Sequence, residues 1–292
     1  MKERDTLHKF LFEHASIRGD VVHLDATWRE VLKRHEYPLP MRSLLGEMMA
    51  AAALLTATLK FEGSLILQLQ GSGPVTLGVV ECSSERLLRG LVRWEGDVVT
   101  APLSELVGVG QLVITIEQQR TGERYQGVVE VAGSSIAEAI EGYLYQSEQL
   151  ETRLWLAADG QAAAGMLVQC MPTRKAGEDE DAWPRIVQLA DTVKDAELLG
   201  LDAHEILHRL FYEEDVRLFD ALPVAFRCSC SSERVQNTLR MLGHEEVRGI
   251  IAEQGAVDVT CEFCNKKYLL DAVDAEALFA DSPVSGDASV RH

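Results

Sequence analysis

Four of the six cysteines lie in two close pairs near the C-terminus. Cys228 and Cys230 form a C-x-C pair, and Cys261 and Cys264 form a C-x-x-C pair after thirty intervening residues. Each pair can supply two soft ligands from one turn, and four thiolates in a tetrahedron are a common ligand set of structural Zn²⁺ sites. The spacing therefore predicts one zinc ion bound by these four cysteines. The C-x-C pair is unusual, because ordinary zinc ribbons repeat C-x-x-C and leave one more residue to wrap around the ion.

Two roles are open for such a site. A segment of about sixty residues has little core of its own, so the thiolates can serve as a structural staple. They can also form a redox switch, because metal-bound sulfurs are thiolates, the species that peroxide and hypochlorous acid attack. Oxidation within both pairs would consume every ligand and release the ion. A disulfide between near neighbours constrains the unfolded chain little, so cellular thiols should be able to reduce it.

The acidic charge of the chain is uneven. The formal net charge is −18 over 292 residues. Residues 176–225 contain 4 Lys or Arg against 13 Asp or Glu, so this short segment carries half of the net charge. Nucleic-acid binding needs clustered Lys and Arg that contact phosphates, so the charge disfavours a zinc-ribbon adaptor for nucleic acid.

The N-terminal region carries no export signal. Leu7, Phe10, Leu11 and His14 recur at helical spacing, without the continuous apolar run of a signal peptide. The longest uncharged apolar stretch, residues 48–59, is well short of the roughly 20 residues that cross a bilayer. We therefore expect a cytoplasmic protein with no membrane partner. In a reducing cytosol, paired cysteines are metal ligands or redox sensors more often than structural disulfides.

Residues 1–175 are predicted to form an α+β core domain of mixed strands and helices. Residues 41–60 make an apolar, Ala-rich helix that other elements should enclose, and residues 135–146 make a second helix. Alternating or β-rich patterns predict strands at 64–70, 75–82, 87–94, 112–118, 125–131, 154–157 and 166–171. These elements do not alternate strictly as βαβ, which favours the α+β class over a parallel α/β sheet.

Residues 176–225 are predicted to form a metastable helical linker. Apolar residues between Ile186 and Leu198 follow a helical period, and Asp202 with Glu205 resembles a capping box that opens a helix through Phe211. Short helices are marginal in water unless an apolar stripe packs against another surface, and the acidic excess adds self-repulsion. We expect this segment to fold only when its neighbours hold it.

Residues 226–292 are predicted to form a small zinc-binding domain, with helices at 233–242 and 245–253 and a strand at 257–259. Zinc binding to such modules is worth on the order of 10–16 kcal/mol, so loss of the ion should unfold the domain. The other thiols, Cys82 and Cys170, lie on predicted strands and are expected to be buried and unreactive.

Other candidate sites are weaker. His204, His208 and His244 could compete as zinc ligands, but four cysteines already complete a tetrahedral shell. We expect no P-loop, G-x-S-x-G or H-E-x-x-H motif, and therefore no enzyme active site.

The chain resembles the redox-regulated 33 kDa chaperonins, a family of bacterial heat-shock holdases. The similar C-terminal segments are Cys228–Arg234, Leu242–Glu246, Cys261–Cys264 and Tyr268. The similar N-terminal segments are Leu55–Lys60, Gln68–Pro74 and Tyr125–Val129.

The resemblance implies a mechanism. The reduced form would be inactive, with zinc on Cys228, Cys230, Cys261 and Cys264. Oxidation, helped by heat, would form the disulfides Cys228–Cys230 and Cys261–Cys264 and release zinc. The small domain, which would act as a redox-switch domain, and the linker would then unfold. The activated homodimer would hold unfolded client proteins through its core domain without hydrolysing ATP. The alternative is a thiol-disulfide oxidoreductase that uses one exposed pair, although the βαβ setting usual for such enzymes is missing.

Overall fold

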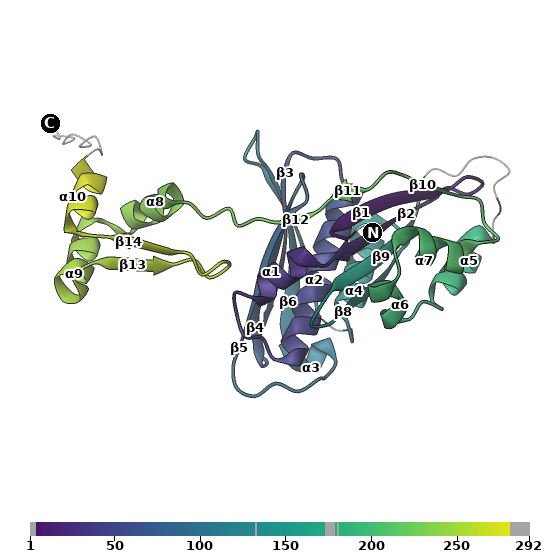
Figure 1. The fold of residues 1–292 in the computed structure, drawn as a ribbon, viewed down its shortest axis with the longest axis horizontal. Coiled ribbons are helices and arrows are strands. Elements are labelled where there is room, and N and C mark those ends of the chain that lie inside the picture. The colour runs from purple at the N-terminus through teal and green to yellow at the C-terminus, as the bar shows by residue number, and fades with distance from the viewer. Residues whose placement is uncertain (1–3, 132, 173–178, 180, 281–292) are drawn as a thin grey trace, which may run out of the picture. The chain divides into compact units, whose positions relative to one another are not determined.

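The computed structural model divides the chain into two units, Met1–Arg227 and Cys228–His292 (Figure 1). It describes residues 4–131, 133–172, 179 and 181–280. The first unit holds two six-stranded sheets, and the second holds a two-stranded sheet with three helices in its described part. The mixed helix and strand content confirms the predicted α+β class.

The strands of the first sheet follow the order β10-β1-β2-β9-β8, with β11 also paired to β1. Their bounds are β1 (Thr6–Phe12), β2 (Ile17–Leu24), β8 (Thr152–Ala158), β9 (Ala163–Cys170), β10 (Val216–Leu218) and β11 (Leu222–Pro223). The second sheet follows the order β12-β5-β4-β3-β6-β7. Its strands are β3 (Gly63–Gly71), β4 (Val75–Ser83), β5 (Leu87–Trp94), β6 (Gly110–Gln118), β7 (Arg124–Glu130) and β12 (Ala225–Phe226).

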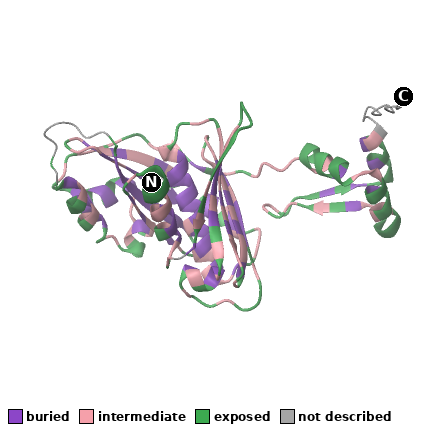
Figure 2. Ribbon diagram, turned by 180° about the vertical axis from the view of Figure 1, so that it is seen from behind, coloured by how far each residue is buried: buried purple, intermediate pink, exposed green. Residues whose placement is uncertain are grey.

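A buried helix, α2 (Leu39–Thr58), packs against strands of both sheets. Small residues allow this close approach: a Cβ added to Gly46 would lie 2.4 Å from the Cβ of Ala158 on β8. The shorter helices of this region are α1 (Ala26–Leu32), α3 (Leu103–Val107) and α4 (Ile136–Glu148). Buried residues gather along α2 and the facing strands to form the main core (Figure 2).

Three helices cover the other face of the first sheet: α5 (Ala182–Ala190), α6 (Asp195–Gly200) and α7 (Ala203–Phe211). We call them the cover helices. The ring of Phe211 packs edge-on against Phe12, with the ring centres 5.1 Å apart. The apolar sheet residues in this second core are Phe10, Phe12, Ile17, Val21, Ala157, Ala164, Met166 and Val168. The first sheet is therefore buried on both faces.

This double burial explains one wrong prediction. The N-terminal residues at helical spacing form strand β1, which pairs with β2 and β10. Leu7 packs into the main core around α2, whereas Phe10 and Phe12 pack under the cover helices on the opposite face. Because both faces of the strand are apolar, its sequence lacks the alternation of a half-buried strand and resembles a helix instead.

The positions of the cover helices agree in part with those predicted from the sequence. Asp202 and Glu205 form the predicted capping box at the start of α7. The helical period between residues 186 and 198 belongs to two helices, because α5 ends at Ala190 and Lys194 caps the start of α6.

The second unit has little core. Its elements are α8 (Ser232–Leu242), α9 (His244–Gln254), β13 (Val257–Thr260), β14 (Lys267–Leu270) and α10 (Ala272–Ala280). Its buried apolar residues are Leu239, Val247, Val257, Leu270, Ala275 and Leu278. Helices near the predicted positions are confirmed, and so is the strand before Cys261. Within the described ranges, no helix has the length and apolar character needed to cross a membrane.

The packing of α2 predicts opposite effects for one substitution at two glycines. Gly46→Ala should destabilise the first unit by about 1–3 kcal/mol, because the new methyl group would overlap the Cβ of Ala158. In Gly142→Ala on α4, the new methyl group would have no atom within 4 Å. This variant should be more stable than the wild type by up to about 1 kcal/mol, because alanine has a higher helix propensity than glycine. Urea unfolding of both variants measures the difference. Equal effects would show that α2 does not lie this close to β8.

Candidate metal centre

The first cysteine pair lies between β12 and α8. Ser231 follows the pair and caps α8, since its Oγ accepts a hydrogen bond from the backbone N of Arg234 at 3.2 Å. The Arg234 guanidinium donates in turn to Ser229 Oγ, between the two cysteines, at 2.9 Å. The short C-x-C segment is thus held by the start of the helix that follows it.

The second pair lies in the turn between β13 and β14. Cys261 N donates to the carbonyl of Lys266 at 2.9 Å, and Asn265 N donates to the carbonyl of Cys261 at 2.7 Å. Asn265 has a left-handed backbone with φ of 56°, which asparagine tolerates better than most residues. The tight turn directs Cys261 and Cys264 to the same side.

The four sulfurs converge. All four Sγ atoms lie within 4.8 Å of one another. The Sγ atoms of Cys228 and Cys261 are 3.7 Å apart, and those of Cys230 and Cys264 are 3.4 Å apart. Sulfurs about 2.3 Å from a central ion in a tetrahedron are about 3.8 Å apart, whereas a disulfide bond is about 2.05 Å long. The cysteines are reduced, and their spacing fits a metal ion.

Hydrogen bonds within the cluster favour the thiolate form of Cys230. The hydroxyl of Tyr268 on β14 donates to Cys230 Sγ at 3.1 Å. Burial opposes ionisation of Cys230, but the bond from Tyr268 and those from the other three thiols outweigh it and lower the pKa of Cys230 to about 7. Burial raises the pKa of Cys264 to about 12, so the thiols ionise unequally without an ion. No pattern in the sequence indicated this role of Tyr268.

Comparison with known proteins places the chain in a family. Residues 5–271 match the model of the Hsp33 protein family. The chain belongs to the Hsp33 family. A 33 kDa chaperonin of Methylobacillus flagellatus is 51% identical over the full length of both chains, and one of Nitrosococcus oceani is 50% identical over the same extent. Membership supports a chaperone function, and these relatives are named as chaperonins, not as enzymes.

A solved structure shares the fold. The crystal structure of the 33 kDa chaperonin from Thermotoga maritima matches with a TM-score of 0.79. The match covers 95% of this chain and 98% of the other, at 22% sequence identity. The resemblance proposed from the sequence is confirmed, and four clustered cysteines able to bind a metal ion are consistent with this family.

The remaining cysteines and one histidine lie elsewhere. Cys82 and Cys170 are buried on β4 and β9, as predicted, and burial raises the pKa of the Cys82 thiol to about 12. His244 at the start of α9 lies 3.0 Å from a carboxylate oxygen of Glu276. None of the three belongs to the metal-sized cluster found among the described residues.

Residues 204–208 read His-Glu-Ile-Leu-His and match the H-E-x-x-H pattern of zinc hydrolases. Both imidazoles are exposed on α7, with ring centres 6.4 Å apart. The Glu205 carboxylate accepts a hydrogen bond from Asp202 N at 3.0 Å, so it serves the capping box. In the part of the chain that the structure describes, no third ligand joins the two histidines. In this chain the H-E-x-x-H residues belong to the first turns of α7, and Glu205 helps to cap that helix.

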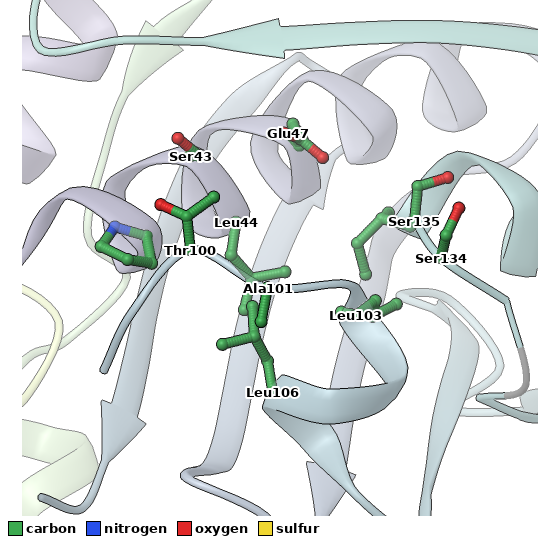
Figure 3. Close-up of a pocket in the computed structure, with 11 residues that line it drawn as sticks. Ser43, Leu44, Glu47, Thr100, Ala101, Leu103, Leu106, Ser134 and Ser135 are labelled. Carbon is green, nitrogen blue, oxygen red and sulfur yellow. The ribbon is translucent and has the colours of Figure 1, made fainter. Parts of the chain in front are cut away.

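A pocket of about 190 Å³ lies beside α2 (Figure 3). Its polar lining residues are Ser43, Glu47, Thr100, Ser134 and Ser135. Its lining contains neither histidine nor cysteine. Burial, with a smaller effect from the charge of Asp195, raises the pKa of Glu47 from 4.5 to about 7.

Replacing Cys261 and Cys264 by Ser should abolish tight zinc binding. The two hydroxyls cannot replace thiolates, and the small second unit should then lose helix content. The measurement is metal stoichiometry after dialysis, together with hydrogen exchange of residues 228–280. The matched control replaces Cys82 and Cys170 by Ala, which should leave one bound zinc per chain. One tight zinc in the Ser variant would contradict the ligand assignment.

Glu47→Gln should stabilise the chain in a pH-dependent way. Below pH 4.5 the carboxyl is protonated in both states, but between pH 4.5 and about 7 only the unfolded chain loses the proton. The wild type therefore loses stability as pH rises through this window. The variant should gain about 3 kcal/mol at pH 8 and under about 1 kcal/mol at pH 5. Urea unfolding of the variant and the wild type at pH 5 and pH 8 measures this gain. Glu105→Gln, at an exposed site on α3, is the control. A stability difference between Glu47→Gln and the wild type that does not change with pH would contradict the prediction.

Proposed function

We propose that this chain is a redox-regulated, ATP-independent holdase of the cytoplasm. In its reduced, inactive form one zinc ion is bound by Cys228, Cys230, Cys261 and Cys264. Oxidation releases the ion and unfolds the second unit and the cover helices. The opened homodimer then binds unfolding proteins and prevents their aggregation under oxidative and heat stress. Nucleic acid and membranes are not its partners.

The donor set supports zinc as the ion. Four thiolates are soft ligands that suit Zn²⁺ in a closed tetrahedral shell, with no position left for a catalytic water. The second unit has few buried apolar residues, so the binding energy of the ion would be a large part of its folding energy. Loss of the ion should therefore unfold this unit.

Oxidation accounts for release of the ion. Formation of Cys228–Cys230 and of Cys261–Cys264 would each transfer two electrons to an oxidant such as peroxide or hypochlorous acid. In the reduced structure, sulfur contacts of 3.7 and 3.4 Å join the two pairs, Cys228 to Cys261 and Cys230 to Cys264. A disulfide within each pair would therefore require the cluster to rearrange and the metal to leave.

The observation that carries the proposal is the apolar sheet face under the cover helices. This face includes Phe10, Phe12, Met166 and Val168, and each of them is buried in the closed form. Large contiguous apolar patches on a protein surface mark interaction sites. Release of the cover helices would uncover such a patch on a rigid sheet, where apolar segments of an unfolding protein could bind.

The chain connects the cover helices to the cysteines. Between α7 and Cys228 the chain forms three strands of two or three residues, and Arg227 N donates to the carbonyl of Leu88 at 2.9 Å immediately before the first cysteine. The helices themselves are short and acidic, so their stability depends on packing against the sheet. Unfolding that starts at the cysteines would reach the cover helices through this segment of short strands.

Titration with an oxidant tests the proposal. Zinc release, measured with a chromophoric chelator, should coincide with a rise in suppression of client aggregation, and ATP should have no effect. The chain with Cys82→Ala and Cys170→Ala should behave like the wild type, because the four cluster thiols remain. Thiol reductant should return the oxidised chain toward the inactive form.

Two outcomes would contradict the holdase. Equal suppression by the reduced, zinc-loaded and the oxidised, zinc-free forms would show that the thiols do not regulate activity. Rapid catalytic reduction of insulin disulfides would favour a thiol-disulfide oxidoreductase, in which one pair turns over repeatedly.

A further inference from the structure

The exposed face of α7 carries two histidines one helical turn apart. His204 and His208 lie four positions apart, so their side chains leave the same side of the helix. Both residues are exposed, and their ring centres are 6.4 Å apart with an angle of 26° between the ring planes. Among the described residues, neither imidazole has a hydrogen-bond or salt-bridge partner. Their ring nitrogens are therefore open to a ligand from solution.

Two imidazoles at this spacing can chelate one divalent metal ion. Imidazole nitrogen suits Zn²⁺, Ni²⁺ and Cu²⁺. An ion bound to one nitrogen of each ring at about 2.0–2.1 Å requires the two nitrogens to be about 3 Å apart. Because both side chains are exposed, rotation about χ1 and χ2 can bring the two nitrogens to this distance without any change in the backbone.

The charges around the pair favour a cation. Asp202 and Glu205 form the capping box at the start of α7, so two carboxylates lie beside His204. They offset the positive end of the helix dipole, which would otherwise disfavour a cation in the first turns. Arg209, which follows His208, lies 2.5 Å from a carboxylate oxygen of Glu197 on α6, so its charge is already paired.

The opposite face of α7 belongs to the cover of the first sheet. Four of its apolar residues are at most 5% exposed and lie in the second core: Ile206, Leu207, Leu210 and Phe211. A helix this short is stable only while it packs against such a surface. The helical spacing of the two histidines therefore exists in the closed form and is lost when α7 leaves the sheet.

We propose that His204 and His208 form a second metal site, at which a divalent transition-metal ion binds folded α7 and stabilises the cover helices in the closed position. Two ring nitrogens and water molecules make up the coordination shell. Glu205 serves the helix cap, and no third protein ligand joins the pair among the described residues, so the ion has a structural role. The site goes beyond the proposed function and rests on it only for the effect on aggregation suppression.

The site would link metal concentration to the opening of the cover helices. An ion that binds the closed form and not the opened form shifts their equilibrium by mass action. At a free metal concentration of 100 times the Kd, opening of α7 becomes about 100-fold rarer. In the opened segment the two rings have no fixed spacing, so each would bind the ion only as a single, weak ligand.

Calorimetric titration tests the site, with Ni²⁺ as the probe and the untagged, reduced, zinc-loaded full chain as the protein. His204→Ala and His208→Ala should each bind Ni²⁺ about 100-fold more weakly than the wild type, because a chelate loses its advantage when either ring is removed. The double variant should differ little from either single variant. Alanine at exposed helix positions favours the helix, so these variants should fold.

His14→Ala is the matched control. His14 is an exposed histidine outside the cover helices, so this variant should bind Ni²⁺ like the wild type. The zinc content of each chain, measured before and after titration, should not change. Equal Ni²⁺ affinity of the wild type and the double variant would overturn the proposal. Single variants that keep the wild-type affinity with one ion fewer would also overturn it, because the two rings would then bind separate ions.

Hydrogen exchange tests the link to the cover helices. At Ni²⁺ of 100 times the Kd, amides of residues 207–211 should exchange about 100-fold more slowly in the wild type. The same Ni²⁺ concentration should leave these amides unchanged in the double variant. Zn²⁺ in place of Ni²⁺ should give the same difference between the two chains. Exchange in the wild type that does not respond to either metal would overturn the proposal.

Aggregation suppression separates this site from the holdase. During oxidation, Ni²⁺ should delay the rise in suppression by the wild type more than by the double variant, which controls for effects of the metal on the client. If exchange depends on the histidines but suppression does not respond to the metal, the site stands and the role proposed for the cover helices fails. Normal activation by oxidant, together with exchange that does not depend on the histidines, overturns the site and leaves the holdase.

Discussion

The first sheet has two apolar faces, and the rest of the first unit is arranged around covering them. Helix α2 covers one face and is itself enclosed by the second sheet. The cover helices occupy the other face with short segments that depend on the sheet for their stability. The two covers therefore differ in kind. Removal of α2 would destroy the main core, whereas removal of α5, α6 and α7 would leave that core intact and expose Phe10, Phe12 and their neighbours.

The second unit differs from the first because it buries little apolar surface. Its few core residues lie among its helices and the β13-β14 hairpin, and the four cysteines lie where the hairpin turn meets the segment before α8. An ion at that point would join two parts of the chain that apolar contacts hold only weakly. Stability concentrated in thiolates is sensitive to oxidation, which leaves an apolar core unaffected. Under the proposed function, an ion in place of a larger core would make the unit both small and sensitive to oxidants.

The sequence predicted the half-exposed strands of the second sheet and the apolar helix α2, but it missed strands β1 and β2 of the first sheet. Strands of the second sheet alternate, so their positions could be predicted from period two, as could the helix around Met48 from its length and apolar run. Strand β1 was misread because Leu7 and Phe10 are buried on opposite faces, and only the tertiary structure shows that the sheet has two covers. The cysteine cluster was predictable because ligand spacing is local. The bond from Tyr268 to Cys230 depends on hairpin geometry, which no local pattern encodes.

A chaperone that works as proposed would have to avoid aggregating with itself, and the distribution of charge along the chain would address this requirement. Residues 176–225 contain 13 acidic residues and would stay covalently attached to the core domain if the cover helices opened. Two opened copies would then repel each other through these segments, whereas a client without such a charge would not be repelled.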